Sequence, residues 1–463
     1  MLPLFLIATG VVFVWAKDLF GEWTAVLAVL LFTTTPPVLA LAGIAYVDFG
    51  LGAFLPATLF AFSRWLERAT MRRSAVLGAM AGCALLSNYT ALVFLPPCLV
   101  AILACRVWAA KRTNEPGIKA REIAAGVAVI ALAALVVIWA GYRFSLQTLN
   151  KTFEKPSQDI AAMRGLPSVV KSVAEGVVAL NPPLPAPQFL KGFMGNVQVG
   201  KAGYKSYLLG RMRNGGWWYF YFVVLALKTP LSLLILAGAG GFFVIRSAIP
   251  GHDWKALVPL AGALVVLLAS IPIKVNLGIR HILFIYPLLA IIGAYGIQRL
   301  WTLRSKWPKT IPAIVIALVA WQVVASVRAR PDYISYMNEL APKQRDQALV
   351  LGCDFDCGQD LWRLSDALRA RQIGHVHLKV WTSTDLASWD LPAFDVLAPN
   401  QPATGWVAVS SLYLRMGELT AGPKLATAYA WLGDYKPVDH VGRTIQLYYI
   451  PEKNPPPAAS PKQ

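Results

Sequence analysis

Long apolar segments alternate with short polar connections along the first 330 residues, and this pattern predicts a series of membrane-spanning helices. A hydrocarbon core of about 30 Å needs roughly 20 apolar residues in helical conformation. We expect ten such segments, at residues 2–16, 24–43, 49–66, 74–88, 90–105, 123–142, 219–245, 256–272, 281–298 and 310–327. The predicted fold class is a polytopic α-helical membrane protein.

The pattern changes after residue 328. Leu361, Leu364 and Leu368 recur at helical spacing, and the stretches "HVHLKVW", "GWVAVSSLYL" and "TIQLYYIP" have the alternation and residue types of strands. We therefore predict a transmembrane domain over residues 1–327, an α/β domain over 328–450 and a proline-rich disordered tail over 451–463.

Composition agrees with the membrane class, because 56% of the residues are hydrophobic and only 14% are charged. The net charge of +19 does not indicate nucleic-acid binding, since basic motifs for that function are absent and membrane proteins gather Lys and Arg in cytoplasmic loops. Three connections collect such residues: Arg64, Arg68, Arg72 and Arg73; Arg106, Lys111, Arg112, Lys119 and Arg121; Arg299, Arg304, Lys306 and Lys309.

If those three connections face the cytoplasm, the outer face receives the loop around Asp48, the long loop 144–217, the loop 273–280 and everything after Arg328. Met1 would then also lie outside. That arrangement is less usual, so we expect that the chain lacks an N-terminal piece.

Asp48 is the first candidate for chemistry. It is the only carboxylate between Glu22 and Glu67, and it opens an apolar segment at the outer boundary. A carboxylate at this depth is expensive and usually faces a cavity or a partner. An acidic residue that caps a helix N-terminus explains the position equally well.

The long outer loop is the second candidate. Its basic side chains outnumber its acidic ones, which favours either an anion site, most simply for phosphate, or a surface that touches anionic headgroups. The stretch "YKSYLLGRMRNGGWWYFYFVVLALKTP" leads from this loop into a helix and contains Lys205, Tyr207, Arg211 and Lys228. Lys228 stands out because it lies inside an apolar run.

Arg280 and His281 form the third candidate. Adjacent residues on a helix point about 100° apart, so one side chain can meet a ligand while the other meets a neighbouring segment. Arginine offers a fixed fork for phosphate, and histidine donates to phosphate or exchanges a proton. The alternative is snorkelling toward headgroups, which explains Lys274 well and Arg280 adequately.

The loop "CDFDCGQD" is the fourth candidate. Asp354, Asp356 and Asp360 lack the spacing of a calcium loop, and we interpret the loop as structural. Cys353 and Cys357, on the oxidising side, are candidates for a disulfide if the loop folds suitably.

Several stretches together resemble the bacterial membrane glycosyltransferases of the dolichyl-phosphate-mannose–protein mannosyltransferase type, which have the GT-C fold. The matching stretches are "LFGEWTAVLAVLLFTTTPPVLALAGIAYVDFGLGAF", "YLLGRMRNGGWWYFYFVVLALKTPLSLLIL", "NLGIRHILFIYPLL", "PDYISYMNEL" and "DFDCGQDLWRL". In the last of them, Cys357 stands where the family ordinarily has Trp.

The resemblance implies transfer of a sugar, of hexosyl or mannosyl type, from a polyprenyl-phosphate donor to a lipid, glycan or protein acceptor. The site would face the periplasmic side of a bacterial inner membrane. The residues it implies are Asp48 for catalysis and metal or acceptor binding, and Arg280, His281 and Lys228 for substrate binding. From the basic outer loop we add Lys205, Arg211 and Tyr207 as predicted substrate-binding residues. It also implies a divalent cation, Mg²⁺ or Ca²⁺.

Enzymes of this type usually hold a catalytic carboxylate in the first outer loop, and this sequence begins beyond that loop. Two other function classes therefore stay open. A transporter or lipid flippase would use intramembrane charges as a substrate path, although no inverted repeat is evident. A non-catalytic relative would have lost the first loop altogether.

Overall fold

The computed structural model describes residues 1–44, 46–113, 120–153, 176, 179–203, 205–341, 352–382, 384–414 and 428–452. The chain divides into two compact units. The first comprises Met1–Lys205 and Asn214–Arg328, and the second comprises Ser206–Arg213 and Ala329–Gln463.

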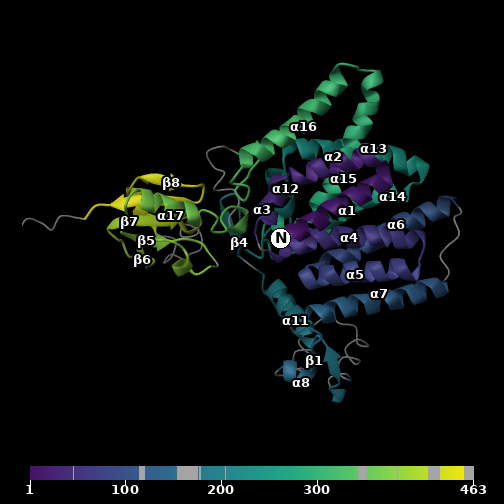
Figure 1. Cartoon of the computed structure of the whole chain (residues 1–463), viewed down its shortest axis with the longest axis horizontal. Helices are drawn as coiled ribbons and strands as arrows, with labels where there is room; N and C mark the ends of the chain where they lie inside the picture. Colours follow the sequence, from purple (N-terminus) through teal and green to yellow (C-terminus); the bar gives the residue numbers. More distant parts are fainter. Residues whose placement is uncertain are drawn as a thin grey trace, which may run out of the picture. The chain divides into compact units, whose positions relative to one another are not determined.

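The first unit is helical. Its helices before the long loop are α1 (Leu2–Phe20), α2 (Glu22–Thr33), α3 (Pro36–Ala42), α4 (Val47–Glu67), α5 (Met71–Ser87), α6 (Ala91–Thr113) and α7 (Ala120–Gly141). Those after the loop are α12 (Phe220–Lys228), α13 (Leu231–Gly251), α14 (Trp254–Ser270), the short 3₁₀ helix η1 (Ile279–Ile282), α15 (Ile285–Thr302), η2 (Leu303–Ser305) and α16 (Thr310–Ala329). Helix α5 packs between α4 and α7 (Figure 1).

The membrane class predicted from the sequence is confirmed. Helices α1, α4, α6, α7, α13 and α16 are each long and apolar enough to cross a bilayer. The pair α2 and α3, bent by 68°, adds a seventh candidate span. Each of the ten predicted segments contains helix, but α5, α14 and α15 do not meet the same length and hydropathy criteria.

The prediction of one continuous segment over 219–245 is wrong, because the chain breaks there into α12 and α13. Thr229 between them has an extended backbone, with φ −96° and ψ 135°. The following residue, Pro230, explains this conformation: its ring disfavours helical geometry at the residue before it, and it has no N–H to donate. Lys228 therefore ends a helix.

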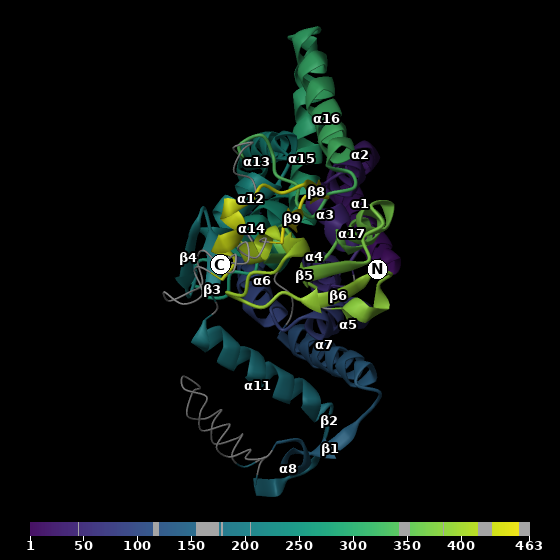
Figure 2. The ribbon, with the colours of Figure 1, turned by 90° about the vertical axis from the view of Figure 1, so that its left-hand side faces the viewer.

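Helices α13 and α15 are in close contact through glycines. A Cβ atom on Gly240 would lie 1.9 Å from the Ile292 carbonyl oxygen, and one on Gly296 would lie 2.5 Å from that of Leu236. Small residues allow such close approach in membrane helix pairs. Figure 2 shows the turn between α15 and α16 extending beyond the other helices of this unit.

The described part of the long loop contains short elements. They are β1 (Leu146–Thr148), α8 (Leu149–Thr152), β2 (Pro183–Pro185) and α11 (Pro187–Ala202). Strands β1 and β2 pair antiparallel. The hairpin that follows, β3 (Lys205–Leu208) and β4 (Arg211–Asn214), has most of its residues in the second unit.

The second unit is the predicted α/β part, and its class is confirmed. Its sheet has the order β6-β5-β7-β9-β8. The strands are β5 (His375–Lys379), β6 (Ala393–Val396), β7 (Gly405–Ser410), β8 (Asp439–Val441) and β9 (Ile445–Ile450). Strand β5 pairs parallel to β6 and β7, whereas β9 is antiparallel to β7 and β8.

Helix α17 (Leu361–Ala370) covers one face of this sheet. Leu361, Leu364 and Leu368 are buried against Val376 and Leu378 of β5, as their helical spacing predicts. Most of the predicted disordered tail, residues 453–463, lies outside the described residues.

Candidate functional site

Asp48 lies in the first turn of α4 and is buried, with 8% of its surface exposed. The residue in the N-cap position is Tyr46, and the helix start has no side-chain capping bond. The capping explanation for Asp48 is therefore not supported. Its Oδ1 instead accepts a hydrogen bond of 2.8 Å from Asn88 Nδ2.

Asn88 belongs to the short turn between α5 and α6. Its Oδ1 accepts hydrogen bonds from the Thr90 backbone N–H at 2.9 Å and from Thr90 Oγ1 at 2.7 Å. Asparagine commonly stabilises a turn by bonding to the backbone two residues on. The turn thus fixes the asparagine amide that holds Asp48.

Arg280 and His281 lie in η1, which follows Gly278. That glycine has φ 93°, a conformation that side chains with a Cβ rarely adopt, and it turns the chain into the 3₁₀ helix. The side chains of the pair meet different partners. His281 Nδ1 contacts the Tyr221 hydroxyl at 2.6 Å, and its Nε2 contacts Thr90 Oγ1 at 3.2 Å.

The guanidinium group of Arg280 is held on one side. Its Nε donates to the Leu277 carbonyl oxygen at 3.1 Å, and its carbon lies 4.7 Å from the centre of the Tyr46 ring. Its Nη1 is 3.9 Å from Asp48 Oδ2, an ion pair too long for a hydrogen bond. Among the described residues, the terminal nitrogens of Arg280 donate no hydrogen bond.

These residues form one connected set, which we call the polar network. It is defined as Asp48, Asn88, Thr90, Tyr221, Arg280 and His281. They come from α4, the α5–α6 turn, α12 and η1, so distant parts of the sequence meet at one end of the helices. The network offers a carboxylate oxygen beside guanidinium donors that have no hydrogen-bond partner among the described residues.

The other predicted substrate-binding residues have different surroundings. Lys228 is buried, with 1% exposed, at the end of the helix in which Tyr221 lies. Seven residues separate the two, about 10 Å along the axis. Tyr207 is buried in β3, whereas Lys205 and Arg211 are exposed on the hairpin. Tyr207 and Arg211 belong to the second unit.

The surroundings of Asp48 do not fit a resident divalent cation. Such ions take several oxygen ligands, usually including more than one carboxylate. Within the described residues, the groups of three or more potential metal ligands do not include Asp48. Its nearest charged neighbour is the cation Arg280. The described residues around Asp48 therefore do not support the expected Mg²⁺ or Ca²⁺ at this carboxylate.

The loop "CDFDCGQD" is built into the fold of the second unit. Asp360 accepts hydrogen bonds from the Thr444 N–H and hydroxyl and is ion-paired with Arg363 at 2.8 Å. Burial raises the pKa of Asp356 to about 6. Cys357 is disulfide-bonded, and the side chain of Cys353, its predicted partner, lies outside the described residues.

Sequence reasoning missed three members of the network: Asn88, Thr90 and Tyr221. The available signal was the polar stretch "SNYT" between two apolar segments, at the same predicted end as Asp48. Tyr221 was hidden among neighbouring aromatic residues typical of a membrane interface.

A different charged cluster occupies the other end of α4. Glu67 pairs with Arg64 at 3.4 Å, Arg73 at 3.3 Å and Lys255 at 3.2 Å. These residues line a cavity of about 500 Å³ together with Arg68, Arg106 and Trp254. Among the described residues that line it, five are basic and one is acidic.

A model for dolichyl-phosphate-mannose-protein mannosyltransferase matches residues 4–146. This confirms, for that part of the chain, the resemblance inferred from the sequence. The matched part contains Asp48, Asn88 and Thr90, whereas Tyr221, Arg280 and His281 lie beyond it.

Two solved structures of ArnT from Cupriavidus metallidurans are also similar. The apo structure has 15% identity and a TM-score of 0.42, and the structure bound to undecaprenyl phosphate has 14% and 0.41. Each match covers 96% of this chain and 82% of the other. A search of curated proteins found no match.

Proposed function

We propose that this integral, multi-pass membrane protein is a glycosyltransferase that moves a sugar from a polyprenyl-phosphate donor to an acceptor hydroxyl. The observation that carries the proposal is the pairing of Asp48 with Arg280, whose terminal N–H groups have no hydrogen-bond partner among the described residues. The family match over residues 4–146 supports the reaction class.

The pair suits both halves of such a transfer. The acceptor oxygen attacks the anomeric carbon and loses its proton as the bond between that carbon and the phosphate oxygen breaks. The bonding electrons leave with the carrier phosphate. Asp48 Oδ2, which faces Arg280, accepts the hydroxyl proton or orients it. The Arg280 fork neutralises the charge that develops on the phosphate.

His281 has a positioning role in this scheme. Both its ring nitrogens have partners, Tyr221 and Thr90, on separate segments. The ring therefore ties η1 to α12 and to the α5–α6 turn. Because Arg280 is the adjacent residue, these contacts fix the backbone that aims its guanidinium group.

We place the reaction on the periplasmic side of a bacterial inner membrane. The polar network lies at one end of α4 and the basic cluster around Glu67 lies at the other. Basic residues mark the cytoplasmic ends of membrane helices. The network then faces outward, where a sugar carried on a polyprenyl phosphate would be transferred.

Cysteine labelling tests this orientation. Trp218, 63% exposed just before α12, and Lys111, exposed near the end of α6, would each be replaced by Cys after Cys83, Cys98 and Cys105 are changed to Ala. A membrane-impermeant maleimide added to spheroplasts should label the variant at 218 and spare the one at 111. The opposite pattern would overturn the orientation.

For the sugar, we propose a hexose of mannosyl type, and the description of the matching family supports this choice. The acceptor is a hydroxyl on a lipid, glycan or protein. Purified protein in proteoliposomes would be given polyprenyl-phosphate sugars that differ in the sugar and membrane extracts as acceptor. Mass spectrometry would identify the product.

Arg280→Ala tests the phosphate role in the same assay. Removing a preorganised donor to developing charge typically costs a factor of about 100 to 1,000 in rate. The matched control is Arg246→Ala, an exposed arginine on α13 without an ion pair in the described residues. Undiminished transfer by Arg280→Ala would contradict the proposed phosphate role. Movement of the donor across the membrane without any covalent product would indicate a flippase.

A further inference from the structure

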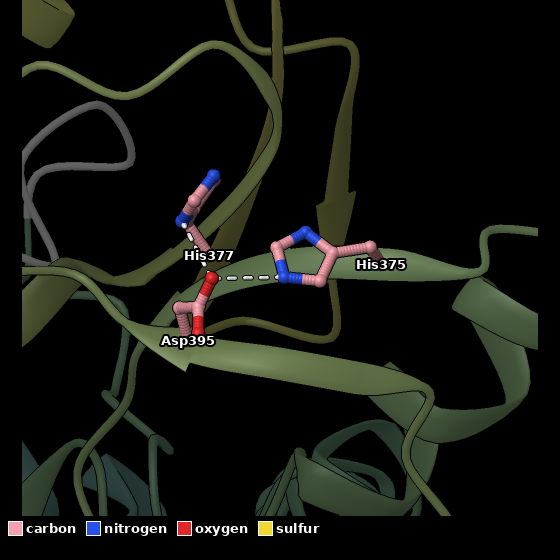
Figure 3. A group of neighbouring side chains, drawn as sticks. All are labelled: His375, His377 and Asp395. Atoms are coloured by element: carbon pink, nitrogen blue, oxygen red, sulfur yellow. Dashed lines mark hydrogen bonds and ion pairs between the residues drawn. The ribbon is translucent and has the colours of Figure 1, made fainter.

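We propose that the second unit carries a binding site for a divalent transition metal, of the zinc type, made by His375, His377 and Asp395. The site lies on the β-sheet and shares no residue with the polar network. Figure 3 shows the two histidines on β5 and the aspartate on the neighbouring strand β6.

The strand geometry brings the three side chains together. His375 and His377 are two residues apart on β5, so they point to the same face of the sheet. In the parallel pairing of β5 with β6, His377 lies opposite Asp395. The intervening Val376 points the other way, into the core under α17.

The ligand atoms are close to the spacing that a metal needs. Asp395 Oδ2 is 2.9 Å from His375 Nε2 and 4.0 Å from His377 Nδ1, and one atom from each residue lies within 4.8 Å of the others. A tetrahedral site with bonds of about 2.0–2.1 Å separates its ligand atoms by about 3.3–3.4 Å. Small side-chain rotations close the difference.

The backbone beneath the site is well supported. Strand β5 is hydrogen-bonded on both sides, to β6 and to β7. Val376 and Leu378, which alternate with the histidines, are 0% and 1% exposed. Ligands mounted on such strands keep their spacing better than ligands on loops. The ion therefore meets a largely preformed donor set.

The ligand side chains themselves are accessible. Those of His375, His377 and Asp395 are 49%, 24% and 68% exposed. A metal can enter from solvent and keep at least one water ligand. Three protein ligands with an open position distinguish such a site from a closed structural one.

The donor set selects the class of metal. Two imidazole nitrogens and one carboxylate suit zinc, copper or nickel, whereas magnesium and calcium prefer oxygen ligands. The next side chain on this face, Lys379, lies 4.7 Å from the centre of the Tyr413 ring. Its positive charge is thereby held by a neighbouring aromatic face.

The test uses the full-length protein in detergent, purified through a tag without histidine and stripped of metal. Zinc binding would be measured by equilibrium dialysis and elemental analysis. We expect one equivalent to be lost in His375→Ala/His377→Ala and in Asp395→Asn. The matched control, His440→Ala, removes an exposed histidine on β8 and should retain that equivalent.

Cobalt provides a second readout independent of enzymatic activity. Bound Co²⁺ should give visible ligand-field absorption that zinc abolishes and an excess of Mg²⁺ leaves intact. Circular dichroism of each variant would establish that it is folded. Equal zinc binding by folded wild type and the double histidine variant would overturn the site. A wild type that binds no zinc at about 100 µM would do the same.

Discussion

The two acidic residues of α4, Asp48 and Glu67, have opposite surroundings. Nineteen residues separate them, about 28 Å along the helix, which is close to the thickness of a hydrocarbon core. Glu67 has three cations within 3.4 Å. Asp48 has one cation at 3.9 Å, and a neutral amide supplies its 2.8 Å hydrogen bond.

This difference separates a structural carboxylate from a reactive one. The charge of Glu67 is matched several times over, so the carboxylate links α4 to α5 and α14 and has little left to offer a ligand. Asp48 and Arg280 each leave hydrogen-bonding capacity unused among the described residues. An acceptor hydroxyl and a phosphate are the groups that would use it.

The largest difference between Asp48 and Glu67 is expected in the rate of sugar transfer after each carboxylate is replaced by its amide. Asp48→Asn should lower the rate by a factor of about 100 to 10,000, because proton acceptance by a positioned side chain contributes that much. Glu67→Gln should leave the rate within a factor of about 3. Initial rates in proteoliposomes, normalised to folded protein, measure both.

Equal losses in the two variants would mean that Asp48 acts through stability rather than chemistry. A melting curve for each variant in detergent separates these explanations, since the isosteric Asp48→Asn substitution retains an oxygen that can accept from Asn88 Nδ2.

Much of the fold could be predicted from the sequence, because apolar segment length and the basic connections are properties of single stretches of chain. The break at Thr229–Pro230 was missed because the residues on both sides are apolar, and hydropathy alone does not register the restricted backbone before a proline. The segment predicted over 24–43 likewise bends between α2 and α3, where Thr35 precedes Pro36.

The site was predictable only in part. Asp48, Arg280 and His281 are charged or titratable residues beside apolar runs, so composition revealed them. Asn88 and Thr90 are short polar residues in a turn, and their role depends on how that turn meets η1. Helical geometry predicted that the side chains of Arg280 and His281 point in different directions. Which residues they contact could be learned only from the tertiary structure.

A smaller effect on transfer is expected from Tyr221→Phe. The change removes the hydroxyl that contacts His281 Nδ1 at 2.6 Å and donates to the Val275 carbonyl oxygen at 2.9 Å. Loss of such hydrogen bonds costs about 1 kcal/mol, or roughly a factor of 5 to 10 in rate. Because the tyrosine acts through His281 and Arg280, the loss should appear in the kcat of the folded protein, beyond any change in melting temperature.

Tyr219→Phe provides the control two residues earlier, where the hydroxyl has no hydrogen bond in the described part of the chain. If both phenylalanine variants match wild type in kcat, the contact between Tyr221 and His281 does not position the arginine.

The smallest effect concerns stability at the basic end. Glu67→Gln leaves Arg64, Arg73 and Lys255 facing one another, and partly exposed pairs of this kind contribute about 1–2 kcal/mol together. We expect the melting temperature in detergent to fall by about 1–3 °C. The difference in melting temperature between Glu67→Gln and wild type should shrink in about 1 M salt, where the Debye length is about 3 Å.

The control variant Glu22→Gln breaks a single exposed pair with Lys17 and should change the melting temperature by less. If the two variants have the same melting temperature at low salt, the ion pairs of Glu67 do not stabilise the fold, and packing of the helices alone positions the three cations. Glu67 would then have no structural role to set against the proposed chemical role of Asp48.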